Sequence, residues 1–110
     1  MTHYFSKKDH FQKIDTATKR SIAVYNAEAM AVKVKFEQPT SKPDLHQHQH
    51  QQITYVIAGR FTFWLEEEKL ELRTGDVLLI EPNKQHGCIC HTTNGELLDV
   101  FQPLREDFLL

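Results

Sequence analysis

The chain has 110 residues, of which 40% are hydrophobic and 25% charged, and its formal net charge is −2. This length suits one domain and is too short for two, and the slightly acidic balance excludes a basic nucleic-acid-binding surface. No apolar run approaches the roughly 20 residues that span a bilayer, and the N-terminus lacks the apolar core of a secretory signal peptide. We therefore expect neither a nucleic-acid nor a membrane partner.

Apolar and polar residues alternate along most of the chain, which is typical of β-strands with one buried face. We expect an N-terminal arm over residues 1–18 and one domain over residues 19–110. In chain order, the alternation predicts strands at residues 20–25, 30–36, 52–57, 61–65, 70–72, 77–80, 88–92 and 97–102. Turn residues separate these segments, and residues 104–110 are expected to form a terminal helical turn. Many short strands with regular turns predict an all-β antiparallel barrel or sandwich.

Cys88 and Cys90 are one residue apart on a predicted strand. Their side chains point to the same face, but their Cα atoms lie near the outer limit for an unstrained disulfide. We expect two free thiols that pack as small apolar side chains. Free thiols favour a reducing, cytoplasmic location.

Three of the seven histidines lie within residues 45–51, where histidine and glutamine alternate. If this stretch belongs to the strand that follows it, His46, His48, His50 and Gln52 share the face that continues into the core. Histidine is the commonest side-chain metal ligand, and a polar end of a core strand suits a metal site at the mouth of a barrel. A solvated loop without a metal is the alternative that this stretch alone leaves open.

Two motifs resemble those of the cupin family. In the first, two histidines one residue apart precede a third ligand and then a glycine, as do His46, His48, Gln52 and Gly59. In the second, a segment that begins at a glycine ends at the last histidine ligand, as in residues 75–87 with His86. The resemblance implies a double-stranded β-helix, or jelly-roll barrel, that holds one divalent metal ion through His46, His48, Gln52 and His86.

The third ligand position departs from the family, in which a glutamate is usual. Here it is Gln52, and Gln51 is the alternative ligand if the strand carries a bulge. A neutral amide leaves a bound dication with its full charge, which favours acid–base chemistry over oxygen activation. Imidazole and amide ligands suit Ni, Zn, Mn, Fe or Co alike, so the sequence does not choose among these metals.

Asp99 and Phe101 share one face of the last predicted strand, and Arg105 follows it closely. A buried carboxylate needs a cation or a hydrogen-bond donor, and Arg105 is the partner that the sequence suggests. The alternative is that Asp99 faces solvent while Leu98 and Val100 point inward.

Residues 99–108 resemble the C-terminal signature of small cupins related to the pectin-degradation protein KdgF, and residues 19–37 and Gln52 resemble that group too. Its members convert 4,5-unsaturated monouronates to the open-chain keto form. The resemblance implies that Asp99 and Arg105 are catalytic and that Phe101 and Arg105 bind a sugar-acid substrate. We expect Arg105 and the metal to lower the pKa of Asp99 and keep it a base.

Two other functions fit the same residues. One is a non-catalytic metal- or sugar-binding cupin module, and the other is an Fe(II) dioxygenase, which the neutral Gln52 makes less favourable. A homodimer is expected in each case, because the exposed edge strands of a small barrel pair readily.

Overall fold

The structure is a computed structural model that describes residues 6–110. Within this range it consists of β-strands and two short 3-10 helices, with no α-helix. The elements are η1 (Ser6–Lys8), β1 (Gln12–Lys13), β2 (Thr18–Tyr25), β3 (Met30–Phe36), β4 (Gln51–Ala58), β5 (Arg60–Leu65), β6 (Glu68–Arg73), β7 (Val77–Ile80), β8 (His86–Cys90), β9 (Gly95–Gln102) and η2 (Glu106–Leu109). Neither helix of this part of the chain has the length or apolar character needed to span a membrane.

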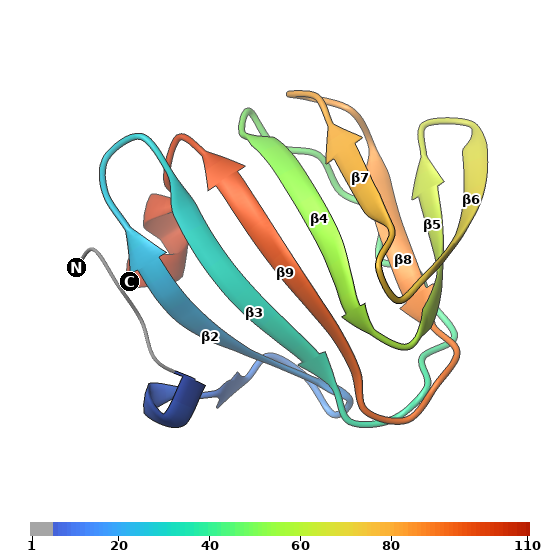
Figure 1. Cartoon of the computed structure of the whole chain (residues 1–110). Coiled ribbons are helices and arrows are strands. Elements are labelled where there is room, and N and C mark those ends of the chain that lie inside the picture. The colour runs from blue at the N-terminus through green and yellow to red at the C-terminus, as the bar shows by residue number, and fades with distance from the viewer. Residues whose placement is uncertain (1–5) are drawn as a thin grey trace.

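The strands form two antiparallel sheets (Figure 1). The larger sheet has the order β1-β2-β3-β9-β4-β7, and the smaller has the order β6-β5-β8. The last strand, β9, lies between β3 and β4, so strands that are distant in sequence become neighbours, as in jelly-roll folds. The predicted all-β antiparallel architecture is confirmed.

The two sheets are joined by an apolar core. Phe36, Val56 and Leu97 of the larger sheet pack with Phe61 and other buried residues of the smaller sheet. The rings of Phe36 and Phe61 meet edge to face, with centroids 5.2 Å apart, an arrangement that aromatic pairs favour. This core fills one end of the space between the sheets and leaves the other end for polar side chains.

Two tight turns bring the two sequence motifs together. Gly59 and Gly75 adopt φ values of +101° and +96°, which residues with a Cβ rarely adopt. The Gly59 N–H donates to the Thr74 hydroxyl at 3.1 Å, and the Thr74 N–H donates to the Gly59 carbonyl at 3.1 Å. The turn after β4 is therefore fixed against the turn before β7.

The predicted strands are all present, with ends that differ by no more than a few residues. The strand predicted at residues 52–57 does not extend back to residue 46. β4 begins at Gln51, and the residues before it form only an isolated bridge between His46 and His86. The side chains of His46 and His48 bond to main-chain carbonyls two residues away. Such local bonds favour an irregular backbone over a regular ladder.

Candidate functional site

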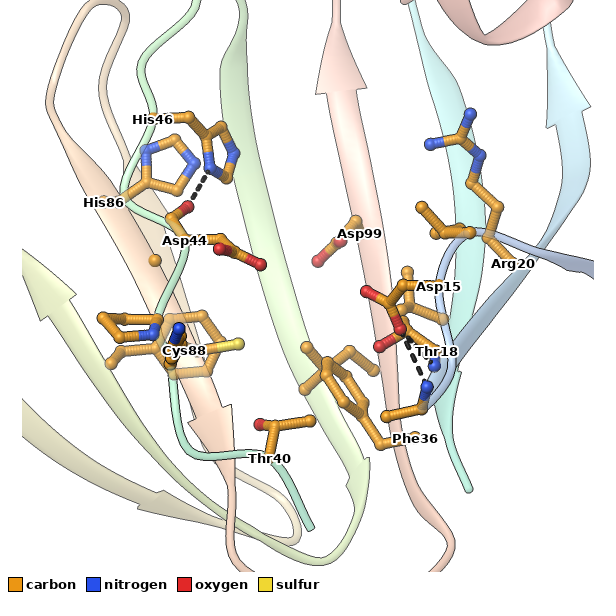
Figure 2. Close-up of a pocket in the computed structure, with 18 of the residues that line it drawn as sticks. Asp15, Thr18, Arg20, Phe36, Thr40, Asp44, His46, His86, Cys88 and Asp99 are labelled. Carbon is orange, nitrogen blue, oxygen red and sulfur yellow. Dashed lines mark hydrogen bonds between the residues drawn. The ribbon is translucent and has the colours of Figure 1, made fainter. Parts of the chain in front are cut away.

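The candidate site is a cavity of about 650 Å³ between the two sheets. Figure 2 shows its walls: His46, His86 and Cys88 lie on one side, and Thr18 and Arg20 lie on the other. Asp99 lies between the two walls (Figure 2). A cavity of this size, lined by both apolar and many polar side chains, has the character of a site for a small polar molecule.

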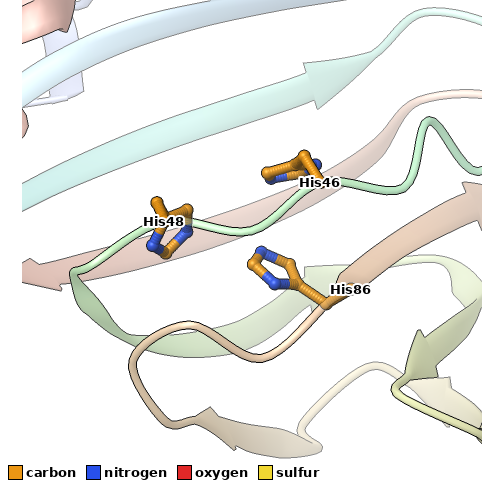
Figure 3. A group of neighbouring side chains, drawn as sticks. All are labelled: His46, His48 and His86. Carbon is orange, nitrogen blue, oxygen red and sulfur yellow. The ribbon is translucent and has the colours of Figure 1, made fainter.

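Three imidazoles converge at one end of this cavity (Figure 3). Each of His46, His48 and His86 offers a ring nitrogen, and these nitrogens lie within 4.8 Å of one another. The backbone explains the convergence, because the His46 N–H donates to the His86 carbonyl at 2.9 Å and the His86 N–H donates back at 2.8 Å. This isolated bridge holds the loop before β4 against the start of β8.

The main chain also fixes the orientation of each imidazole. Nδ1 of His46 lies 2.9 Å from the carbonyl oxygen of Asp44, Nδ1 of His48 lies 2.9 Å from that of His50, and Nδ1 of His86 lies 2.8 Å from that of Lys84. A carbonyl oxygen only accepts, so each Nδ1 carries the proton. In the neutral imidazoles every Nε2 is therefore left with a lone pair, which is the form that binds a metal.

Gln52 adds a fourth candidate ligand atom, an amide oxygen, to these three nitrogens. Its Oε1 lies 3.0 Å from Nε2 of His48, and its Nε2 donates to the Thr54 hydroxyl at 2.8 Å. Thr54 in turn donates to Oδ1 of Asp99 at 2.7 Å. Because the Thr54 proton goes to Asp99, the hydroxyl accepts from Gln52, and this fixes the amide oxygen toward the histidines.

The site has the donor set of a divalent cation. Oε1 of Gln52 and the Nε2 lone pair of His48 are two acceptors only 3.0 Å apart, close to the spacing of neighbouring ligands around an ion bound at about 2.1 Å. Nε2 of His86 is buried and has no hydrogen-bond partner among the described residues. Burial also lowers the pKa of His86 to about 4 and lowers that of His48, so both rings are neutral at pH 7.

The other candidate ligand, Gln51, lies elsewhere. Its side-chain amide donates to Oε1 of Gln102 at 2.9 Å in an exposed pair on β4 and β9. Only 6% of Gln52 is exposed. Of the two glutamines, it is Gln52 whose side chain contacts the histidine cluster. His50 stands beside the cluster with its ring centroid 5.5 Å from that of His48, and its carbonyl orients His48.

Asp99 and Phe101 are buried on the inner face of β9, so the alternative in which Asp99 faces solvent is wrong. Arg105 lies over the ring of Phe101, with its guanidinium carbon 5.1 Å from the ring centroid. Phe101 in turn packs edge to face with His48 at 5.8 Å. The structure thus brings the three residues of the C-terminal segment to the histidine cluster.

One expectation about Asp99 needs correction. Its hydrogen-bond partner is Thr54, whereas the Nε and Nη2 atoms of Arg105 donate to Asp107 at 3.0 and 2.8 Å. In the metal-free site burial raises the pKa of Asp99 to about 6, and the positive charge of Arg105 acts in the expected, lowering direction. Asp107 binds the guanidinium because it lies in the first turn of η2, two residues after Arg105, which is the N-cap of that helix.

Sequence reasoning missed Thr54 and Arg20. Thr54 shares the inward parity of Gln52 and Val56, which was the available signal. Arg20 lies on β2 opposite Val34 and lines the cavity, and its parity with Ile22 was the corresponding signal. Cys88 also lines the cavity, and burial raises the pKa of its thiol, so it is a protonated, unreactive neighbour. Both cysteines are free, as expected.

A barrel of two antiparallel sheets with three converging imidazoles that could hold a metal ion has the architecture of a cupin. Residues 33–101 match the Cupin domain family, and the chain belongs to that family. It is 34% identical over 111 residues to the pectin degradation protein KdgF of Dickeya dadantii (strain 3937), with 99% of this chain and 100% of the relative covered.

Two solved structures show the same likeness. KdgF from Halomonas sp. has 30% identity and a TM-score of 0.91, with 98% of both chains covered. An RmlC-like cupin from Shewanella frigidimarina has 33% identity and a TM-score of 0.90, with 98% of this chain and 96% of that one covered. The cupin jelly roll and the KdgF resemblance expected from the sequence are therefore confirmed.

Proposed function

We propose that the protein is a metal-dependent enzyme that acts on a sugar acid and converts 4,5-unsaturated monouronates to the linear keto form. The observation that carries the proposal is the chain of contacts from His48 through Gln52 and Thr54 to Asp99. These contacts link a buried carboxylate to a group of candidate metal ligands. The likeness to KdgF supports the choice of substrate.

His46, His48, Gln52 and His86 would hold one divalent ion, chosen among Ni, Zn, Mn, Fe and Co. When bound, this ion supplies a Lewis acid that polarises a substrate oxygen. All four ligands are neutral in the form that binds metal, so nothing in the ligand set offsets the charge of the ion. This favours binding of an anionic substrate.

Asp99 moves the protons. The reaction is an isomerisation in which a hydroxyl loses its proton as the sugar ring opens, and a ring carbon gains one as the enol becomes a ketone. Burial raises the pKa of this carboxyl group to about 6 in the metal-free site, and a bound dication would lower it, so Asp99 accepts a proton as a base at pH 7 and returns it as a general acid–base group. Thr54 holds this carboxylate in place from the opposite strand.

Phe101 and Arg105 form the part of the wall next to Asp99. The guanidinium of Arg105 lies over the rings of Phe101 and Phe108, at 5.1 and 4.3 Å, and Asp107 holds one edge of it. These contacts hold the guanidinium in the cavity wall, where its positive charge favours an anionic substrate. Phe101 supplies an apolar surface for the sugar ring.

The test follows the ultraviolet absorbance of a 4,5-unsaturated galacturonate with metal-loaded protein. We expect the absorbance to decay with the intact protein and with Gln51→Ala, and to persist with His48→Ala. Saturable binding without decay would instead identify a binding module. Oxygen consumption with added Fe(II) would identify a dioxygenase.

A further inference from the structure

A second arginine lies in the same cavity wall and has no role in the function proposed above. Arg20 is half-buried on β2, and its guanidinium carbon lies 3.7 Å from the centroid of the Phe108 ring. The guanidinium carbon of Arg105 lies 4.3 Å from the centroid of the same ring. Two like charges are therefore held against one aromatic side chain at the edge of the cavity.

The acidic groups nearby do not balance these two charges. Asp107 accepts two hydrogen bonds from the Nε–Nη2 edge of Arg105 and reaches Arg20 only through a longer-range attraction. Within residues 6–110, Arg20 makes no salt bridge and its guanidinium donates no hydrogen bond. Partial burial of a guanidinium whose N–H groups lack acceptors costs free energy, and a bound anion would offset this cost by accepting hydrogen bonds from them.

The position of Arg20 matches the shape of the cavity. Figure 2 shows Arg20 on the wall opposite His46 and His86, with Asp99 between them. A sugar acid that spans the cavity can therefore place its carboxylate at one wall and its reacting oxygens at the other. A guanidinium fork matches the two oxygens of a carboxylate.

We propose that Arg20 binds the carboxylate of the sugar acid and so determines the specificity of the site for uronates over neutral sugars. The choice of a uronate rests on the proposed function, but the proposal that Arg20 completes an anion site does not require turnover. The Nε and Nη2 atoms of Arg105 already donate to Asp107. Arg105 therefore supplies a neighbouring positive charge and not the bidentate contact.

The test is calorimetric titration of the metal-loaded protein with galacturonate and with its methyl ester, neither of which carries the reactive double bond. We expect the intact protein to prefer the carboxylate by at least about tenfold, the order of a charge-assisted hydrogen-bond pair. Arg20→Gln should lower this preference by about tenfold and leave the part that Arg105 and a bound dication supply. Arg73→Gln is the matched control, because Arg73 is exposed on β6 and does not line the cavity, and it should retain the preference.

Arg20→Lys is the second variant, which keeps the charge and loses the planar fork. It should lie between the intact protein and Arg20→Gln in preference, and it should raise KM for the unsaturated uronate more than it lowers kcat. Melting temperatures of both variants near that of the intact protein show that the fold is kept. If either folded variant retains the full preference, or if the intact protein does not prefer the carboxylate, the assignment of Arg20 is wrong.

The same experiment separates this inference from the proposed function. A preference for galacturonate that Arg20→Gln lowers by about tenfold, in a protein that does not turn over the unsaturated uronate, supports the anion site and overturns the proposed reaction. Turnover with a KM that Arg20→Gln leaves unchanged supports the reaction and overturns the role of Arg20.

Discussion

Thr54 and Asp99 lie directly opposite each other on β4 and β9, and the Thr54 hydroxyl donates a 2.7 Å hydrogen bond to the Asp99 carboxylate. Thr54 is fully buried, and 9% of Asp99 is exposed. The same hydroxyl accepts from Gln52. One threonine therefore orients both the candidate acid–base group and the candidate amide ligand.

Thr54→Val should test this double role, because valine keeps the shape of threonine and removes the hydroxyl. We expect metal affinity to fall by about tenfold to a hundredfold, the usual effect of losing a group that orients a ligand. The measurement is a competition titration with a chelator. Thr62→Val is the control, since Thr62 is also buried but bonds to Glu71 and His91 on the other sheet. Equal affinities for Thr54→Val and the intact protein would contradict the proposed orientation.

Substitution of the ligands should separate the two adjacent glutamines. His48→Ala and Gln52→Ala should lower the metal content per chain, because both lose an atom of the converging group. Gln51→Ala should retain the metal content of the intact protein, since its amide bonds to Gln102. Elemental analysis of the dialysed proteins measures this directly. A metal loss with Gln51→Ala equal to that with Gln52→Ala would refute the choice of Gln52.

His86 and Asp99 should oppose each other in the pH dependence of the metal-free protein. Burial lowers the pKa of His86 to about 4, below the value of about 6.5 for an unfolded histidine. The unfolded chain then binds more protons here, so this contribution to stability falls as the pH falls from about 6.5 to 4. Burial raises the pKa of Asp99 to about 6, above the value of about 3.9 for an unfolded aspartate. The folded chain then binds more protons at Asp99, so this penalty on stability grows as the pH rises from about 3.9 to 6.

Asp99→Asn should therefore leave the pH dependence of stability that comes from His86 without the opposing contribution of Asp99. We expect the melting temperature of the metal-free variant to fall more steeply between pH 6.5 and about 4.5 than that of the intact protein. Thermal unfolding in a series of buffers with chelator present measures both slopes. Parallel slopes would show that Asp99 does not titrate in this range.

Gly87→Ala should displace the histidine cluster, although Gly87 itself is not a candidate ligand. A Cβ at Gly87 would overlap the main-chain carbonyl of Pro43, and the loop that begins there carries His46. Because backbone must move, we expect a lower melting temperature together with loss of metal. Cys88→Ala, at the next position of β8, should keep the metal content. Normal metal content in Gly87→Ala would show that the loop adjusts without moving His46.

The homodimer stays a prediction, and the outer face of the larger sheet offers a place to test it. Ile53 and Tyr55 on β4 stand opposite Leu79 and Val77 on β7, and between 37% and 60% of each is exposed. β7 is also an edge strand, and such strands pair readily. If this face joins two copies, Val77→Lys should convert a dimer to a monomer in light scattering, whereas Leu109→Lys should not.

Much of the fold could be predicted from the sequence because the strands alternate strongly. Met30–Phe36 begins and ends where the apolar alternation does, and Val77–Ile80 coincides with an unbroken apolar run between turn residues. The histidine segment could not be placed in this way. Its polar side chains satisfy their own backbone, and an alternating pattern of His and Gln does not distinguish a strand from a loop that meets a distant strand at one bridge.

The candidate ligands follow from motif spacing, whereas the partners of Asp99 and Arg105 do not. Arg105 is close to Asp99 in sequence, but the side chain that reaches Asp99 comes from β4, which lies beside β9 only in the folded sheet. Arg20 comes from β2, two strands away from β9. Contacts of this kind depend on the order of strands in the sheet, and the alternation of apolar and polar residues along a strand does not specify that order.

The three imidazoles are held by main-chain carbonyls, and the fourth candidate ligand is an amide. Such a ligand sphere carries no charge of its own and offers an ion little electrostatic attraction beyond coordination. Because the ligand set does not select among divalent ions, we expect the metal supply of the cell to decide which ion is present. The same chain would then carry different ions in media of different metal content, without any change in its sequence.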